Sequence, residues 1–142
     1  MARAWHAPDP VALAKPLADL GRLFAGLAAR GLRIAVATSD DREPTERTLD
    51  ALGLTPWVDA AVCADDGVEG KPSPEMILHL CRVLSVPPHR TAVVGDSPAD
   101  MAMGRRAGAG RVIGVLSGVS DTEHLAPSAD LVLDSIADLL AD

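Results

Sequence analysis

The stretch Val93–Met101, VVGDSPADM, runs from two valines through a glycine to two aspartates that stand four residues apart. The apolar residues predict a buried strand, and Pro98 fits the first turn of a helix that would end near Gly108. Asp96 and Asp100 would then meet at the carboxyl end of that strand. The positive end of the helix offsets part of their mutual repulsion, and a hard cation would offset it better.

Apolar runs and helical periodicities alternate along the rest of the chain in the same way. The sequence predicts strands at 32–37, 60–64, 91–94, 111–115 and 131–133, and helices at 17–29, 44–52, 73–84, 98–108 and 135–140. This alternation predicts right-handed βαβ units and a doubly wound, Rossmann-like α/β domain with a parallel sheet of about five strands. In such sheets ligands bind beyond the carboxyl ends of the strands.

Length and composition limit the classes of protein to which the chain can belong. Its 142 residues suit one domain, and 48% hydrophobic with 23% charged residues fits neither a disordered chain nor a membrane span. The formal net charge of -7 opposes binding to nucleic acid or to an anionic membrane. Cys63 and Cys81 form no C-x-x-C pair and no leader is recognisable, so we expect a cytoplasmic protein.

Asp96 and Asp100 are the candidate metal ligands. Magnesium is commonly held by one or two carboxylates together with water and a substrate phosphate, so two aspartates suit a Mg²⁺ site. The alternative is that Asp96 caps the helix and Asp100 is an ordinary acidic residue of its first turn. Two other acidic pairs, Asp40-Asp41 and Asp65-Asp66, are interpreted as solvated turn residues.

Three residues are candidates for phosphate binding. Thr38 and Ser39 follow a buried strand, where their hydroxyls and the turn's N–H groups could hold phosphate oxygens or could simply cap the turn. Lys71 lies between Gly70 and Pro72 in a chain whose basic residues are nearly all arginine. A single lysine in a stiff loop indicates a point charge for phosphate or carboxylate, whereas the alternative is a solvated surface lysine.

In that order, VATSD at 36–40, GKPSP at 70–74 and VVGDSPADM resemble motifs two, three and four of the haloacid dehalogenase-like (HAD) hydrolase superfamily. The resemblance covers about 17–142, and ALGL, RRAGAGRVIGV and ADLVLDSIADLL are similar to the phosphoglycolate phosphatase-like branch. It implies magnesium-dependent hydrolysis of a small phosphorylated metabolite through an aspartyl-phosphate. Thr38 would hydrogen-bond the phosphoryl group, Lys71 would neutralise it, and Asp96 would ligate Mg²⁺ with Asp100 in support, directly or through water.

The sequence departs from this superfamily at its first motif. That motif is an apolar strand ending in D-x-D, whose first aspartate attacks phosphorus, and no D-x-D occurs in the 142 residues. Residues 1–16 remain unassigned. The helical cap that many relatives insert between motifs one and two, and that selects substrate, is also absent, and the interval 39–71 fits only one helix and one strand, so it holds no second cap. We therefore expect the central strand of the sheet to be missing, so that its neighbours either pair directly or receive another chain or segment.

Three functions are compatible with these observations. The first is the C-terminal part of a HAD phosphatase, truncated or split and inactive alone, which would self-associate or bind a partner chain that supplies the strand. The second is a non-catalytic domain that binds phosphate and magnesium, or an interaction domain. The third, a receiver domain of two-component signalling, is disfavoured because there the acidic pair precedes the Lys-Pro, whereas Lys71-Pro72 precedes Asp96 here.

Overall fold

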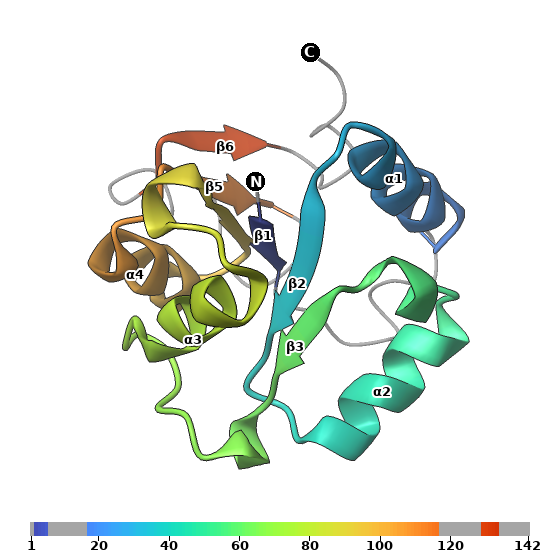
Figure 1. The fold of residues 1–142 in the computed structure, drawn as a ribbon, viewed down its shortest axis with the longest axis horizontal. Coiled ribbons are helices and arrows are strands. Elements are labelled where there is room, and N and C mark those ends of the chain that lie inside the picture. The colour runs from blue at the N-terminus through green and yellow to red at the C-terminus, as the bar shows by residue number, and fades with distance from the viewer. Residues whose placement is uncertain (1, 6–16, 117–128, 134–142) are drawn as a thin grey trace.

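A computed structural model describes residues 2–5, 17–116 and 129–133, which form a parallel sheet between two layers of helices (Figure 1). The strands are β1 (Ala2–Trp5), β2 (Arg33–Ala37), β3 (Ala60–Val62), β4 (Ala92–Gly95), β5 (Arg111–Val115) and β6 (Leu131–Leu133). The α-helices are α1 (Leu17–Ala29), α2 (Arg42–Ala51), α3 (Glu75–Leu84) and α4 (Pro98–Ala107). Single 3-10 turns occur at η1 (Thr55–Trp57), η2 (Ala64–Asp66) and η3 (Pro88–Arg90).

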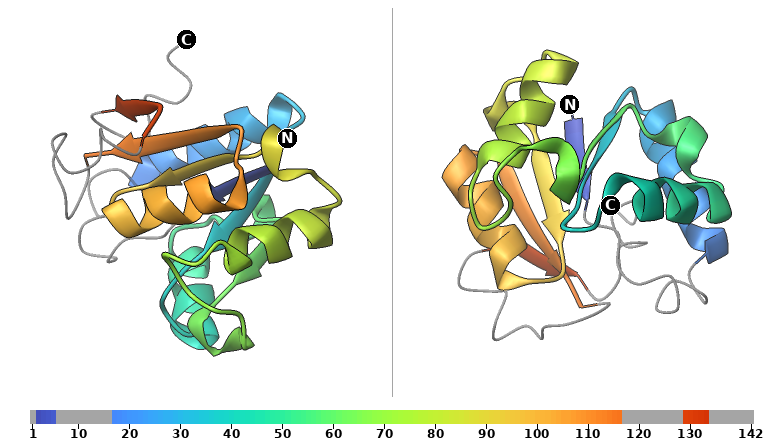
Figure 2. Two further views of the ribbon diagram at one scale, coloured as in Figure 1. Left: turned by 90° about the vertical axis from the view of Figure 1, so that its left-hand side faces the viewer. Right: turned by 90° about the horizontal axis from the view of Figure 1, so that it is seen from below.

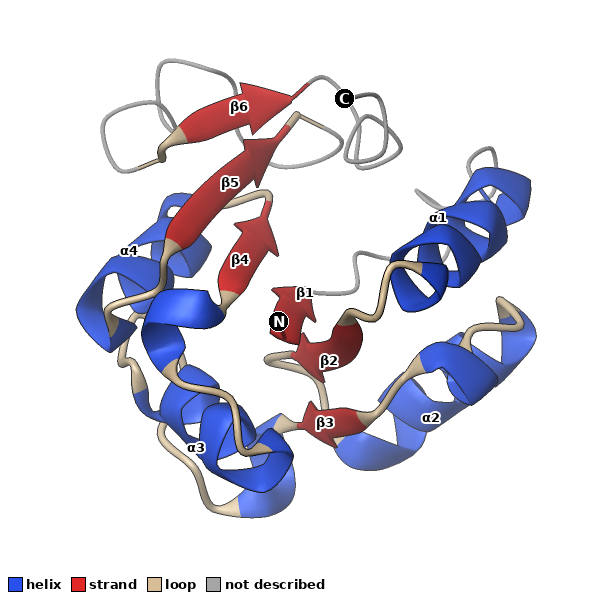
Figure 3. Cartoon of the chain, turned by 45° about the horizontal axis from the view of Figure 1, so that its top comes forward, coloured by secondary structure: helices blue, strands red, loops and turns tan. Residues whose placement is uncertain are grey.

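The strand order is β3-β2-β1-β4-β5-β6, and every neighbouring pair is parallel. Helices α1 and α2 cover one face of the sheet, and α3 and α4 cover the other (Figures 2 and 3). The predicted doubly wound α/β fold is therefore confirmed. The helix predicted at 135–140 lies outside the described residues.

The centre of the sheet corrects one prediction. β1 lies between β2 and β4, with Ala4 opposite both Ala35 and Val93, so the central position is filled by a segment of the same chain. The segment ARAW contains no continuous apolar run, because Arg3 interrupts it, so its sequence does not predict a strand. The position is nevertheless occupied because the backbone groups of β2 and β4 need partners, and any extended backbone can provide them.

Alternate residues of the central strands pack into two separate cores. On one face Ile34 and Val36 of β2 join Leu23, Phe24 and Leu27 of α1. The other face is lined by residues of β2 and β4 together with α3 and α4, namely Ala35, Ala37, Val93, Met76, Ile77, Leu80 and Met103.

The α4 layer approaches the sheet closely. A Cβ on Gly104 would lie 2.9 Å from Val112 Cγ2 and 3.1 Å from Val93 Cβ, so only glycine lets this helix pack at its present distance. This contact fixes α4, whose first turn carries one of the candidate site residues, Asp100. Among the described residues, no helix is long and apolar enough to cross a membrane.

Candidate functional site

The candidate residues follow three strands whose carboxyl ends meet at one edge of the sheet. Thr38 comes directly after β2, and Asp96 comes directly after β4. Since β1 lies between these two strands, the two residues leave the sheet about 10 Å apart. Lys71 arrives on the segment that links β3 to α3.

Lys71 and Asp100 form the most buried ion pair described. Lys71 Nζ lies 2.6 Å from Asp100 Oδ1, and the side chains are 9% and 1% exposed. The surface-lysine interpretation is therefore wrong, because this ammonium is directed inward onto a specific carboxylate. A buried charge is tolerated when it is paired and hydrogen-bonded, and both conditions are met here.

The second oxygen of Asp100 is also occupied. Asp100 Oδ2 accepts hydrogen bonds from Ser97 Oγ at 2.9 Å and from the Asp96 backbone N–H at 3.2 Å, while Ser97 Oγ accepts from the Asp100 N–H to cap α4. Gly95 leaves room for this folded-back carboxylate, since a Cβ there would lie 2.3 Å from Asp100 Cβ. Serine, not Asp96, is thus the cap, and Asp100 holds the loop together.

Asp96 is 6% exposed and lies where β4 meets α4. Asp100 commits one oxygen to Lys71 and the other to the loop, so in this arrangement it suits a supporting role more than that of a direct ligand. A single direct carboxylate is compatible with Mg²⁺, which retains several waters and also binds substrate phosphate. Within the described ranges, no group of three or more His, Cys, Asp and Glu residues is arranged to hold a metal. The donor set therefore fits a magnesium ion that takes most of its ligands from water and phosphate.

Thr38 is fully buried and turns the chain away from the sheet. Its N–H donates to Val62 O at 3.1 Å, and its Oγ1 accepts from the Asp40 N–H at 3.1 Å. The hydroxyl thus does cap the turn, as the simpler interpretation proposed. A hydroxyl also has an O–H donor, which that bond does not use and which a phosphate oxygen would need. Ser39, the next residue, is exposed at the same edge.

An arginine that sequence analysis did not select joins two of these segments. Arg42, the first residue of α2, donates to Asp66 through Nε at 3.2 Å and through Nη2 at 2.6 Å. Its backbone N–H donates to Asp65 Oδ1 at 2.9 Å. Asp65 and Asp66 are therefore more than solvated turn residues. A long-range pair of this kind leaves no spacing signal in a single sequence.

The hydrogen bonds of Arg42 and the burial of Cys63 shift pKa values in this part of the site. The hydrogen bond with Asp66 raises the pKa of Arg42, and the same bond with Arg42 lowers the pKa of Asp66. Burial raises the pKa of the Cys63 thiol, which lies just before η2. Asp66 is therefore ionised at neutral pH, while the thiol stays protonated.

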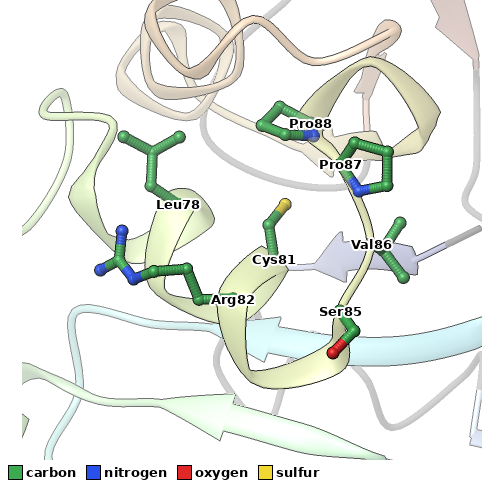
Figure 4. Close-up of a pocket in the computed structure, with 7 residues that line it drawn as sticks. All are labelled: Leu78, Cys81, Arg82, Ser85, Val86, Pro87 and Pro88. Carbon is green, nitrogen blue, oxygen red and sulfur yellow. The ribbon is translucent and has the colours of Figure 1, made fainter.

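A surface hollow of about 290 Å³ lies away from this edge (Figure 4). Its lining comes from the end of α3 and the segment that follows, namely Leu78, Cys81, Arg82, Ser85, Val86, Pro87 and Pro88. Since α3 returns antiparallel to the strands, its C-terminal end lies toward the amino edge of the sheet. The hollow is thus separate from the candidate site.

Comparison with known proteins identifies relatives for most of the chain. The family model described as haloacid dehalogenase-like hydrolase matches residues 9–108. A phosphoglycolate phosphatase of Aquifex aeolicus is 32% identical over 75% of this chain and 50% of its own length. One of Rhodospirillum rubrum is 36% identical over 74% of this chain and 44% of its own. The chain spans about half the length of these curated relatives.

Solved structures agree with the sequence matches. A predicted phosphoglycolate phosphatase from Haemophilus somnus aligns with a TM-score of 0.80 at 27% identity, over 87% of this chain and 55% of that chain. CbbY from Rhodobacter sphaeroides, in complex with phosphate, aligns with a TM-score of 0.76 at 32% identity, over 87% and 56%. The family match begins at residue 9 and therefore excludes β1.

Proposed function

The chain belongs to the haloacid dehalogenase-like hydrolase family, and we propose that it forms the phosphate- and magnesium-binding half of a phosphomonoesterase site. The observation that carries the proposal is the buried pair of Lys71 with Asp100 at the carboxyl edge of the sheet. An ammonium fixed in this way provides a positive charge beside the end of β4, where a phosphate dianion would need one.

Each candidate residue has a separate role in this proposal. The Thr38 hydroxyl donates to a phosphate oxygen, and the N–H groups and hydroxyl at Ser39 contribute to the same pocket. Lys71 neutralises the phosphate, and Asp96 ligates Mg²⁺. Asp100 orients Lys71 and the Asp96 backbone through its two oxygens. When bound, the magnesium ion would offset the charge of both carboxylate and phosphate.

The covalent step needs a carboxylate that the matched motifs do not contain. The family resemblance assigns that step to a D-x-D aspartate, and the printed sequence has no D-x-D. We propose that the 142 residues alone bind phosphate but do not hydrolyse esters, and that turnover requires an acidic group from a partner chain or another segment. Small phosphorylated metabolites are the proposed substrates, because several curated relatives are phosphoglycolate phosphatases.

A second candidate is a binding domain with no catalytic role. It is favoured by one specific observation: the central strand comes from residues 2–5, which precede the family match. A domain that only binds would need the phosphate contacts and no nucleophile. The two candidates differ in whether adding an acidic partner segment produces turnover.

Calorimetric titration with inorganic phosphate in the presence of Mg²⁺ tests the shared part of both proposals. We expect the wild-type chain to bind, Lys71→Ala to weaken binding by about a hundredfold, and Arg105→Ala, at the far edge of the sheet, to match wild type within about twofold. Failure of the wild type to bind phosphate would contradict the proposed site. Hydrolysis of p-nitrophenyl phosphate by the chain alone, lost in Asp96→Ala, would contradict the missing-nucleophile part.

A further inference from the structure

We propose that Arg42 is a positioning residue for the phosphate site, because it locks the segment that carries Thr38 to the segment that leads to Lys71. The inference rests on the proposed function for its ligand. The coupling of the two segments does not depend on the proposed function, because the contacts that produce it involve neither the Thr38 side chain nor the Lys71 side chain. We call Arg42 with Asp65 and Asp66 the arginine clamp.

The clamp connects two turns that follow neighbouring strands. Beyond β2, residues 38–41 lead into α2, and beyond β3, residues 63–66 lead toward the lysine. The Ala64 N–H donates to Asp40 O at 2.9 Å, which is the backbone bond that joins the turns beyond the strand pairing. The clamp adds two side-chain bonds from the Arg42 guanidinium to Asp66 and one from its N–H to Asp65.

Both ends of the clamp are held in place by further hydrogen bonds. Asp66 Oδ2 accepts from the Cys63 N–H at 2.8 Å, which fixes the carboxylate over its own turn. Arg42 Nη2 donates to Ala61 O at 3.1 Å, so the guanidinium also anchors to β3. Fork-shaped bonding to a carboxylate restricts orientation as well as distance, which a lysine ammonium cannot reproduce.

The clamp also substitutes for a missing helix cap. Asp41 stands at the N-cap of α2 but makes no capping hydrogen bond with its side chain. Asp65 provides one instead, from the neighbouring turn, to the first N–H of the helix. The start of α2, and with it the turn that contains Thr38, is therefore positioned by residues of the lysine segment.

The Lys71 segment is held from its other side as well. Arg106 of α4 donates to Pro72 O at 3.5 Å, and the lysine itself bonds Asp100. The segment thus extends between the clamp near β3 and the buried pair near β4. Loss of the clamp leaves the α4 attachments intact and releases the side that adjoins Thr38.

The chain offers a matched control. Arg105 bonds Asp130 at 2.9 Å, and Asp130 also accepts from the Val112 N–H, so this pair joins helix and strand as the clamp does. Its side chains are 45% and 37% exposed, against 41% and 24% for Arg42 and Asp66. It lies at the amino edge of the sheet, where no candidate site residue is found.

The test measures the phosphate affinity of the full chain by calorimetry, with Mg²⁺ present, for Arg42→Ala, Asp66→Asn, the double variant, Arg42→Lys and Arg105→Ala. We expect about a tenfold loss for each clamp variant, an effect of the size seen when outer-shell partners of a site are removed. The double variant should lose little more than either single one. Arg42→Lys should fall between wild type and Arg42→Ala, while Arg105→Ala should stay within about twofold of wild type.

Amide hydrogen exchange on the same variants separates this inference from the proposed function. We expect Arg42→Ala to lower protection at both 38–41 and 63–71, and Arg105→Ala to leave both unchanged. If the wild type binds no phosphate, the proposed function is contradicted. A loss of protection in both 38–41 and 63–71 of Arg42→Ala would still support the coupling of the two segments. Wild-type phosphate affinity in the clamp variants, or unchanged exchange in the two turns, would overturn the inference.

Discussion

The chain turns from a strand into a helix at two places in the site, the β4 corner, where β4 meets α4, and the β2 corner, where β2 meets α2. Different interactions hold these two turns in place. At the β4 corner, Asp100 is 1% exposed and is bonded by Lys71, Ser97 and the backbone of Asp96. At the β2 corner, the residues after Thr38 are exposed and depend on the clamp. One half of the site is thus fixed by burial, and the other by solvent-exposed ion pairs that salt and acid can weaken.

Removing Asp100 should have the largest effect, because it breaks the buried corner. We expect Asp100→Ala to lower the free energy of unfolding by about 3–5 kcal/mol, since it leaves the Lys71 charge without its partner. Urea denaturation measures this loss. The double variant Lys71→Met, Asp100→Leu should recover much of it, and a double variant as unstable as Asp100→Ala would show that the pair is not the cause.

The close packing of α4 predicts a smaller effect that differs between the two helical layers. Gly104→Ala places a methyl 2.9 Å from Val112 Cγ2 and should cost about 1–3 kcal/mol. Gly21→Ala in α1 meets nothing within 4 Å and should stabilise by about 0.5–1 kcal/mol through helix propensity. Thermal unfolding measures both effects: the midpoint should fall for Gly104→Ala and rise for Gly21→Ala. A shift of both midpoints in the same direction would contradict this prediction.

The exposed corner should be the one that responds to acid. The pKa of Asp66 is lowered by its bond with Arg42, so the stabilisation is present above the ordinary carboxyl pKa and is lost as pH falls through the lowered value. We expect Asp66→Asn to have a smaller loss of stability than wild type on going from pH 7 to about pH 3. Equal losses of stability in wild type and Asp66→Asn would show that Asp66 does not contribute to the acid sensitivity.

Salt should produce the smallest effect. At about 1 M NaCl the exposed Arg42–Asp66 pair is screened, so wild type should lose a few tenths of a kcal/mol relative to Arg42→Ala. Parallel salt dependence of the two unfolding curves would contradict this. The buried Lys71–Asp100 pair should keep its contribution under the same conditions, which makes salt a means of separating the two corners.

Sequence patterns predicted those parts of the molecule that local chemistry determines. Helix α1 begins and ends where its periodicity and the positive-φ Gly31 indicate, and the strands β2, β4 and β5 coincide with apolar runs. The β3 strand is shorter than predicted, since Ala64 begins a 3-10 turn.

What the sequence could not provide depends on contacts between distant residues. Arg42 and Asp66 have no motif, and their pairing arises only when β2 and β3 lie side by side. Asp100 was predicted near a metal, but its main partner, Lys71, lies 29 positions away and became visible only in the folded chain. The central strand was missed for a different reason, since backbone pairing, and not side-chain hydrophobicity, places ARAW there.

The position of β1 has a consequence for the order of folding. Ala4 pairs with Ala35 on one side and with Val93 on the other, so β1 has one neighbouring strand that lies far later in the chain. Contacts between such distant residues must overcome a large loop-closure entropy before they add stability. The sheet can therefore join its two halves only after β4 has been made, and until then the edge of β1 that faces β4 in the sheet has no partner strand. The strand that connects the two halves of the sheet can thus pair early with β2 but completes its pairing only when β4 is present.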